Sequence, residues 1–148
     1  MKLVIILSGH EGVGKRTLAE GLYSEFFVRH IHEEVPLLDL IDHYNKFMIE
    51  KTTLLVVVMN DPREIQTFLS ILTVPHFIIQ IKRKGIMTDE RHPIEDLGII
   101  PVFHNDYDKD TSKQCFVKLI DGVCTAVRAR EEERDWMIRT LDRVLERR

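Results

Sequence analysis

A glycine-rich segment near the N-terminus carries residue types that bind phosphate. The segment contains Gly9, Gly12 and Gly14, and Lys15 follows Gly14 directly. The apolar run at residues 3–7 precedes the segment. Glycines let successive backbone N–H groups turn toward one ligand, and the start of a helix adds the positive end of its dipole. The order of buried strand, glycine loop, lysine and helix therefore predicts a site for a polyphosphate.

The spacing of this segment is close to the P-loop pattern, although a chance glycine cluster in a strand-to-helix turn is the alternative. The hydroxyl that normally follows the lysine and ligates Mg²⁺ is replaced by Arg16, and Thr17 comes one residue later. We assign no side chain as a metal ligand and expect water to fill more of the metal shell. The predicted nucleotide contacts in the loop are Gly9, His10, Glu11, Gly12, Val13, Gly14, Lys15, Arg16 and Thr17.

Length and composition indicate one globular domain covering residues 1–148. The chain has 148 residues, of which 44% are hydrophobic and 30% are charged, as is usual for a folded protein. The net charge of −3 disfavours a general nucleic-acid binder, so no stable nucleic-acid complex is expected. Local basic clusters such as residues 82–84 remain candidate ligand sites.

The cysteines and the apolar segments predict a cytoplasmic protein, in the host cytoplasm if the chain is viral. Cys115 and Cys124 are the only cysteines, and their place in a helix-like segment favours buried free thiols over a disulfide or a metal pair. The N-terminal apolar run is too short to cross a bilayer and leads straight into the phosphate loop, so we expect neither a signal peptide nor a membrane span.

Apolar patterns along the rest of the chain alternate between strands and helices. Strands are predicted at 3–8, 53–59, 77–81 and 99–103, the last at an edge because it contains Pro101. Helices are predicted at 15–28, at 37–48 after Pro36, at 62–72 with Asp61 as cap, from 111 onward, and at about 131–147. The alternation predicts an α/β fold of three layers with a mainly parallel sheet.

Polar residues follow each predicted strand, and ligands bind beyond the carboxyl ends of parallel strands. Lys15 can offset phosphate charge, Asp61 can order metal-bound water or an acceptor hydroxyl, and Arg63 can stabilise a transition state. Asp61 has an alternative role as a helix cap. Two further cations, Arg83 and Arg91, belong to a polar segment that is equally compatible with an ordinary solvated loop.

The order of these segments resembles the deoxynucleoside monophosphate kinases of bacteriophage and animal phosphomevalonate kinase. The residues that carry the likeness are the phosphate loop, Asp61-Pro62-Arg63, the basic segment 83–91 followed by 92–95, and the loop 103–106. The resemblance implies a P-loop nucleoside-kinase-like fold, ATP with Mg²⁺, and a small phosphorylated acceptor such as a (deoxy)nucleoside monophosphate. It also implies a lid at about 83–98, Asn105 near the base, and Lys15, Asp61, Arg63, Arg83 and Arg91 as catalytic residues.

The segment from Ser24 to Thr53 departs from that family, because it is short where such kinases fold an acceptor-binding arm. No arginine lies between Arg29 and Arg63, so a phosphate clamp would need Arg63, Lys46 or lid residues. Two alternatives therefore stay open: a P-loop nucleotide-binding protein or ATPase with a regulatory or assembly role, and a degenerate kinase retained for binding.

A second apolar pattern lies near the C-terminus. Trp136 is followed by Met137, Ile138, Leu141, Val144 and Leu145 after a charged run. The simplest interpretation is a helix that covers the core. The alternative is a helix that contributes to a homodimer.

Overall fold

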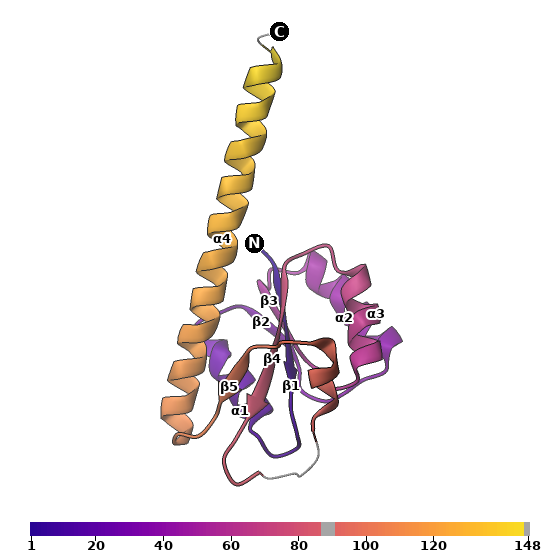
Figure 1. Ribbon diagram of the computed structural model, residues 1–148, viewed down its shortest axis with the longest axis vertical. Coiled ribbons are helices and arrows are strands. Elements are labelled where there is room, and N and C mark those ends of the chain that lie inside the picture. The colour runs from indigo at the N-terminus through magenta and orange to yellow at the C-terminus, as the bar shows by residue number, and fades with distance from the viewer. Residues whose placement is uncertain (87–90, 147–148) are drawn as a thin grey trace.

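A five-stranded parallel sheet forms the centre of the protein in this computed structural model, which describes residues 1–86 and 91–146 (Figure 1). The strands are β1 Leu3–Ser8, β2 Val28–Ile31, β3 Leu54–Val58, β4 His76–Lys82 and β5 Val102–His104, in the spatial order β2-β3-β1-β4-β5. All four strand pairs are parallel. The predicted α/β fold with a parallel sheet is therefore confirmed.

Strand β1 lies at the middle of the sheet because every one of its side chains is apolar or small and fully buried. Leu3 pairs with Leu54 of β3 on one side, and Val4 pairs with His76 of β4 on the other. A strand covered on both faces reads as a continuous apolar run, which is the pattern of residues 3–7.

Helices cover both faces of the sheet. The helices α1 Lys15–Glu20 and α4 Lys109–Glu146 cover one face, together with the 3-10 turn η1 Gly21–Ser24. The helices α2 Leu37–Ile49 and α3 Pro62–Ile71 cover the other, together with the 3-10 turn η2 Pro93–Leu97. Figure 1 shows α4 on one side of the sheet and α2 and α3 on the other. These are the three predicted layers.

The first part of the chain corrects two sequence-based boundaries. The first helix, predicted to reach residue 28, ends at Glu20, where Gly21 begins a 3-10 turn. A Cβ atom on Gly21 would lie 3.1 Å from the Lys113 side chain of α4, so this glycine allows the two helices to approach closely. The strand β2 follows and was not predicted, because its four residues Val28–Ile31 have two polar side chains between two apolar ones and form neither an apolar run nor an alternating pattern.

In the C-terminal part of the chain, the structure corrects the predicted division into two helices. The predicted helices from 111 and at 131–147 are one continuous helix, α4, of 38 residues. Asp108 supports its start, because its carboxylate accepts hydrogen bonds from the backbone N–H and the hydroxyl of Thr111 at 2.9 and 2.7 Å, as an N-cap does. The charged run 128–135 therefore continues the helix on its exposed side. Within the described residues, no helix has the length and apolar character needed to cross a membrane.

Candidate functional site

The loop between β1 and α1 has a backbone shape that only glycine allows. Gly14 has φ 93°, in the left-handed region, and a Cβ atom there would collide with the side-chain nitrogen of Asn105. A Cβ atom on Gly9 would lie 2.5 Å from the backbone oxygen of Ile81 in β4. Both glycines therefore allow neighbouring segments to reach the loop. The result is a curved loop that leads directly into the first turn of α1.

Asn105 holds this loop in place through two hydrogen bonds. Its side-chain amide donates a hydrogen bond to the backbone oxygen of Val13 at 2.8 Å, and its own backbone N–H donates to the backbone oxygen of Lys82 at 2.7 Å. The residue is 7% exposed. The resemblance to phage nucleotide kinases implies that Asn105 lies near a nucleotide base. In the structure, the side-chain amide N–H of Asn105 holds the phosphate loop next to β4 and β5.

A cavity of about 690 Å³ opens in front of the loop. Its walls come from the loop and first turn of α1, from the exits of β2 and β3, and from Arg83 after β4. The lining residues are Gly9, Glu11, Gly12, Gly14, Lys15, Arg16, Thr17, His32, Glu33, Glu34, Val58, Asn60 and Arg83. Of the predicted loop contacts, His10 and Val13 do not line it, and Val13 is buried in the core beneath the loop. The cavity lies at the carboxyl ends of the strands, where ligands bind in this class of sheet.

Lys15 lies across the loop at the wall of this cavity. Its ammonium group is within hydrogen-bonding distance of the backbone oxygen of Gly9 and lies 3.4 Å from that of His10. Partial burial lowers the pKa of Lys15 from its ordinary value, and the negative charges of Glu34 and Glu11 oppose that shift. A desolvated ammonium group attracts an anion strongly, and this position is compatible with binding a phosphate in the cavity.

Glu34 is brought to the same cavity by the exit of β2. Its carboxylate accepts a hydrogen bond from the Asn60 amide at 2.7 Å. The other end of that amide accepts bonds from the Ser8 hydroxyl at 2.9 Å and from the Gly9 backbone N–H at 3.0 Å. Asn60 therefore links the ends of β1, β2 and β3. Sequence reasoning missed Glu34 because it missed β2; the acidic pair 33–34 before Pro36 was the available signal.

Asp61 and Arg63 do not line the cavity. The Asp61 carboxylate accepts the backbone N–H of Arg63 at 2.9 Å and caps α3, which is the alternative that the sequence had left open. Both residues are exposed. In this arrangement the carboxylates that act on Lys15 are Glu34, after the edge strand β2, and Glu11 of the loop itself, and neither follows β3.

The segment predicted as a lid divides into parts with different contacts, and residues 87–90 lie outside the described residues. Arg83 reaches the phosphate-loop cavity, whereas Arg91 lines a separate cavity of about 300 Å³ near β5. The Arg91 guanidinium lies 3.4 Å from Glu95 and 3.5 Å from Asp96, so Arg91 forms ion pairs with two carboxylates of η2. Ile94 is fully buried against the α2–α3 layer, and the ring of His92 contacts His10 of the loop at 4.8 Å between centroids.

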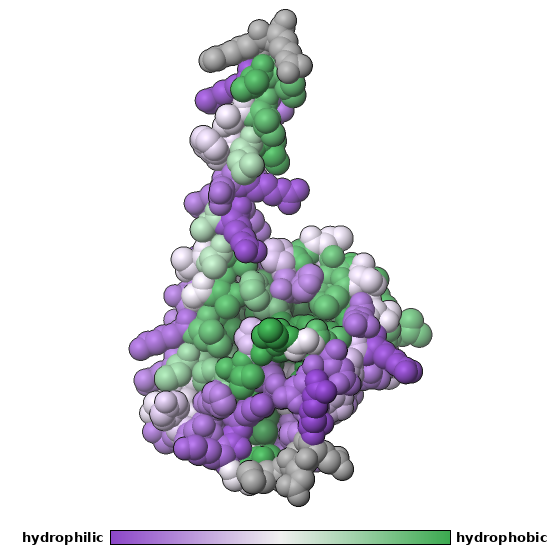
Figure 2. All heavy atoms as spheres, in the orientation of Figure 1, coloured by the Kyte–Doolittle hydropathy of each residue, from purple (hydrophilic) through white to green (hydrophobic). Residues whose placement is uncertain are grey.

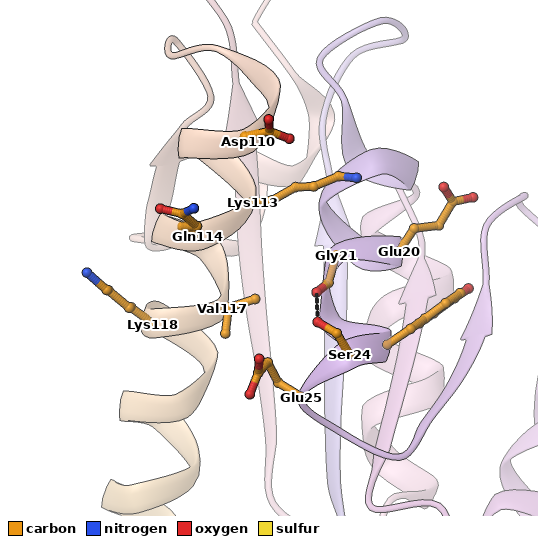
Figure 3. A pocket seen from close by; sticks show the side chains of 10 residues that line it. Glu20, Gly21, Ser24, Glu25, Asp110, Lys113, Gln114, Val117 and Lys118 are labelled. Atoms are coloured by element: carbon orange, nitrogen blue, oxygen red, sulfur yellow. Dashed lines mark hydrogen bonds between the residues drawn. The ribbon is translucent and has the colours of Figure 1, made fainter.

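A third cavity, of about 700 Å³, lies between η1 and the start of α4 (Figure 3). Figure 3 shows Lys113 reaching from α4 toward the side of Glu20 and Gly21, and Glu25 below them. Acids and lysines both line this groove, and none of the predicted site residues does. Among the described residues, no group of three or more His, Cys, Asp or Glu side chains is arranged to hold a metal ion.

Comparison with known proteins establishes the fold. No family model matches the sequence, and no curated protein sequence matches it. Among solved structures, a de novo designed P-loop fold protein has a TM-score of 0.58 at 12% identity, covering 85% of this chain and 96% of that one. A sugar kinase from Janibacter sp. HTCC2649 has a TM-score of 0.56 at 9% identity, covering 82% of this chain and 95% of the other.

Another designed protein, with a P-loop NTPase fold, has a TM-score of 0.51 at 14% identity over 87% of this chain and 96% of its own. Identities this low carry information on architecture alone, and two of these three proteins were designed. The shared architecture agrees with the strand order, the parallel sheet and the glycine loop after β1. The chain therefore has the P-loop NTPase fold.

Proposed function

We propose that the protein is a nucleotide-dependent phosphotransferase that moves the γ-phosphoryl group of ATP to the hydroxyl or phosphate oxygen of a small acceptor. The observation that carries the proposal is that Lys15 and Glu34 line one cavity from two different strand exits. A cation beside a phosphate cradle and a carboxylate opposite it are the parts that phosphoryl transfer needs.

The residues present fit a nucleotide with Mg²⁺. The cavity of about 690 Å³ has the size of small-molecule sites in general, and its glycines leave the loop backbone open to phosphate oxygens. Glu34 and Glu11 lie near Lys15 and suit the hydrated shell of a hard divalent cation. Bound ATP and Mg²⁺ would supply the transferable phosphoryl group and a divalent positive charge.

The side chains of the chain itself have separable roles in this proposal. Lys15 offsets negative charge on the transferring phosphoryl group, and Arg83 adds a second cation from the β4 side of the cavity. Glu34 accepts the proton of the acceptor hydroxyl or orders a metal-bound water. Asn60 positions Glu34 through the 2.7 Å hydrogen bond. The carboxylate role first expected of Asp61 thus belongs to Glu34.

The finer proposal concerns the acceptor, for which we infer a (deoxy)nucleoside monophosphate. The resemblance to phage nucleotide kinases supports it, as do Arg83 and Arg16 on the cavity wall. Neither Arg29 nor Lys46 lines this cavity, and Arg29 pairs with Glu50. A sugar hydroxyl is the second acceptor class, since a sugar kinase shares the architecture.

An acceptor panel tests both levels of the proposal. The purified full chain is incubated with ATP and Mg²⁺ together with each ribo- and deoxynucleoside monophosphate, each nucleoside, and a set of sugars, and ADP and phosphorylated product are measured. At least one acceptor should raise ADP formation above the rate with water and appear as a phosphorylated product. Lys15→Ala is the control for a contaminating kinase.

The panel also separates the alternatives. Product from a sugar or nucleoside alone would keep the phosphotransferase and reject the monophosphate acceptor. ATP hydrolysis that no acceptor accelerates would favour an ATPase, and tight ATP binding without turnover would favour a binding protein. Either of the last two results would contradict the phosphotransferase proposal.

A further inference from the structure

Helix α4 has two halves with different surroundings. Its first half packs on the sheet through five buried residues, Ser112, Phe116, Ile120, Cys124 and Val127. From Arg128 to Glu146, no residue is buried. Figure 1 shows why: the helix projects well beyond the rest of the molecule toward its C-terminus. The second half therefore has no partner within the described chain.

The projecting half nevertheless carries an apolar stripe, which we define as Met137, Ile138, Leu141, Val144 and Leu145. These side chains are between 47% and 59% exposed. At 3.6 residues per turn they lie within an arc of about 120°. The arc includes the helical face of Phe116, Ile120 and Val127, which is buried lower on the same helix. Figure 2 shows apolar atoms gathered along the projecting part of the helix.

An exposed apolar stripe on a helix is stabilised when another surface packs against it. A single helix cannot bury its own apolar face, and helices in proteins obtain most of their stability from packing such a face. We propose that the stripe is the interface of a homodimer, in which the projecting half of α4 pairs with the same segment of a second copy in antiparallel orientation.

The sheet and the elements that cover it, here called the body, pack on the first half of α4. The position of the body selects the antiparallel orientation. Each body covers the same helical face up to Val127. A parallel pair along this face would place the two bodies in the same space. An antiparallel pair places them at opposite ends, so that the two projecting halves overlap freely. The partner helix then ends above the body of the first copy.

Charge complementarity supports the same arrangement. When Ile138 lies opposite Leu141 of the second copy, Arg134 lies opposite Leu145 of that copy. Asp142 of the second copy is then about one helical turn away, within reach of the long Arg134 side chain, and symmetry repeats this contact at the other end. The polar sides of the segment carry both charge signs, including glutamates at 131–133. A helix that lies on anionic lipid needs a cationic polar face, so a second copy suits this segment better than a membrane.

The size of the stripe predicts a dimer of limited strength. Two copies of the stripe would bury an apolar area on the order of 1,000 Å² in total, near the lower limit for specific interfaces. The monomer–dimer equilibrium should therefore depend visibly on protein concentration in the micromolar range.

Sedimentation velocity of the full chain across a wide concentration range tests the proposal. The wild type should shift from monomer to dimer as concentration rises. Leu141→Arg should raise the dimer dissociation constant by about 100-fold or more, because it places a charge at the centre of the stripe. The matched control is Trp136→Arg, five residues away on the opposite face and 64% exposed, which should leave the equilibrium unchanged. Circular dichroism checks that both variants keep their helix.

A charge exchange tests the orientation. Arg134→Asp and Asp142→Arg should each weaken the dimer, and the double variant should restore it, because both pairs are re-formed with reversed sign. A monomer at every concentration, or equal effects of the changes at 136 and 141, would overturn the dimer. A dimer that the double variant fails to restore would overturn the antiparallel register.

Discussion

Strands β1 and β2 lead to the same cavity but differ in almost every other respect. β1 lies at the centre of the sheet, with neighbours on both sides and no exposed side chain. β2 is an edge strand of four residues, pairs with β3 alone, and has a single buried side chain, Ile31. One strand ends in the glycine loop with Lys15, and the other ends in residues 32–34.

The comparison shows that an apolar pattern in the sequence indicates burial and does not indicate function. A central strand must be apolar because both faces are covered. An edge strand can carry polar side chains, which also protect its free edge. Yet the edge strand places Glu34 beside Lys15, so it contributes as much to the proposed chemistry as the central strand does.

The largest effect should follow a change at the exit of β1. Lys15→Ala should lower kcat/KM for phosphoryl transfer by about 100-fold or more, because a desolvated cation at the phosphate site is lost. The fold should survive, since the Lys15 ammonium bonds only to the loop itself. Steady-state kinetics and ATP titration calorimetry measure the effect, with circular dichroism as the control. Unchanged ATP affinity together with unchanged turnover would remove Lys15 from the site.

A change at the exit of β2 should have a large but smaller effect. Glu34→Gln should lower kcat by roughly 10- to 100-fold, because the amide retains the shape but has no negative charge to order a metal-bound water and cannot accept a proton from an acceptor hydroxyl. Asp61→Asn is the matched control: it changes a carboxylate at the exit of β3 that caps α3 and should leave kcat near the wild-type value. A larger loss from Asp61→Asn than from Glu34→Gln would reverse the assignment and return the catalytic role to β3.

The smallest effect concerns His30, in the middle of β2. Burial, with the nearby charge of His32, lowers the pKa of His30 to about 4. Because the unfolded chain binds this proton more readily, stability contributed by neutral His30 is complete above pH 6.5 and is lost as pH falls toward 4. His30 is partly exposed, so we expect a loss on the order of 1 kcal/mol after allowing for solvent screening.

Urea unfolding at several pH values between 4 and 7.5 measures this slope. His30→Gln should flatten the curve in that window. His104→Gln, a change at an exposed histidine on the opposite edge strand β5, is the matched control for the substitution itself. Parallel curves for wild type and His30→Gln would show that His30 does not titrate differently in the folded protein.

The sequence revealed the parts of the fold that are buried on both sides. The apolar runs of β1, β3 and β4 and the capped start of α3 were predictable, because continuous burial and helix capping each leave a local pattern. β2 left none, since its two polar residues stand between two apolar ones and form neither an apolar run nor an alternating pattern. The C-terminal end of α1 and the continuity of α4 through residues 128–135 also escaped prediction.

The candidate site divides in the same way. Its phosphate loop was determined by the sequence alone: the order of apolar strand, glycines and Lys15 requires no distant contact to be recognised. Only the tertiary structure decided that Glu34 lies near Lys15, that Asn105 holds the loop, and that Arg91 lines a separate cavity. The physical reason is that a local motif fixes its own backbone, whereas the position of one strand exit relative to another depends on the order of the strands in the sheet.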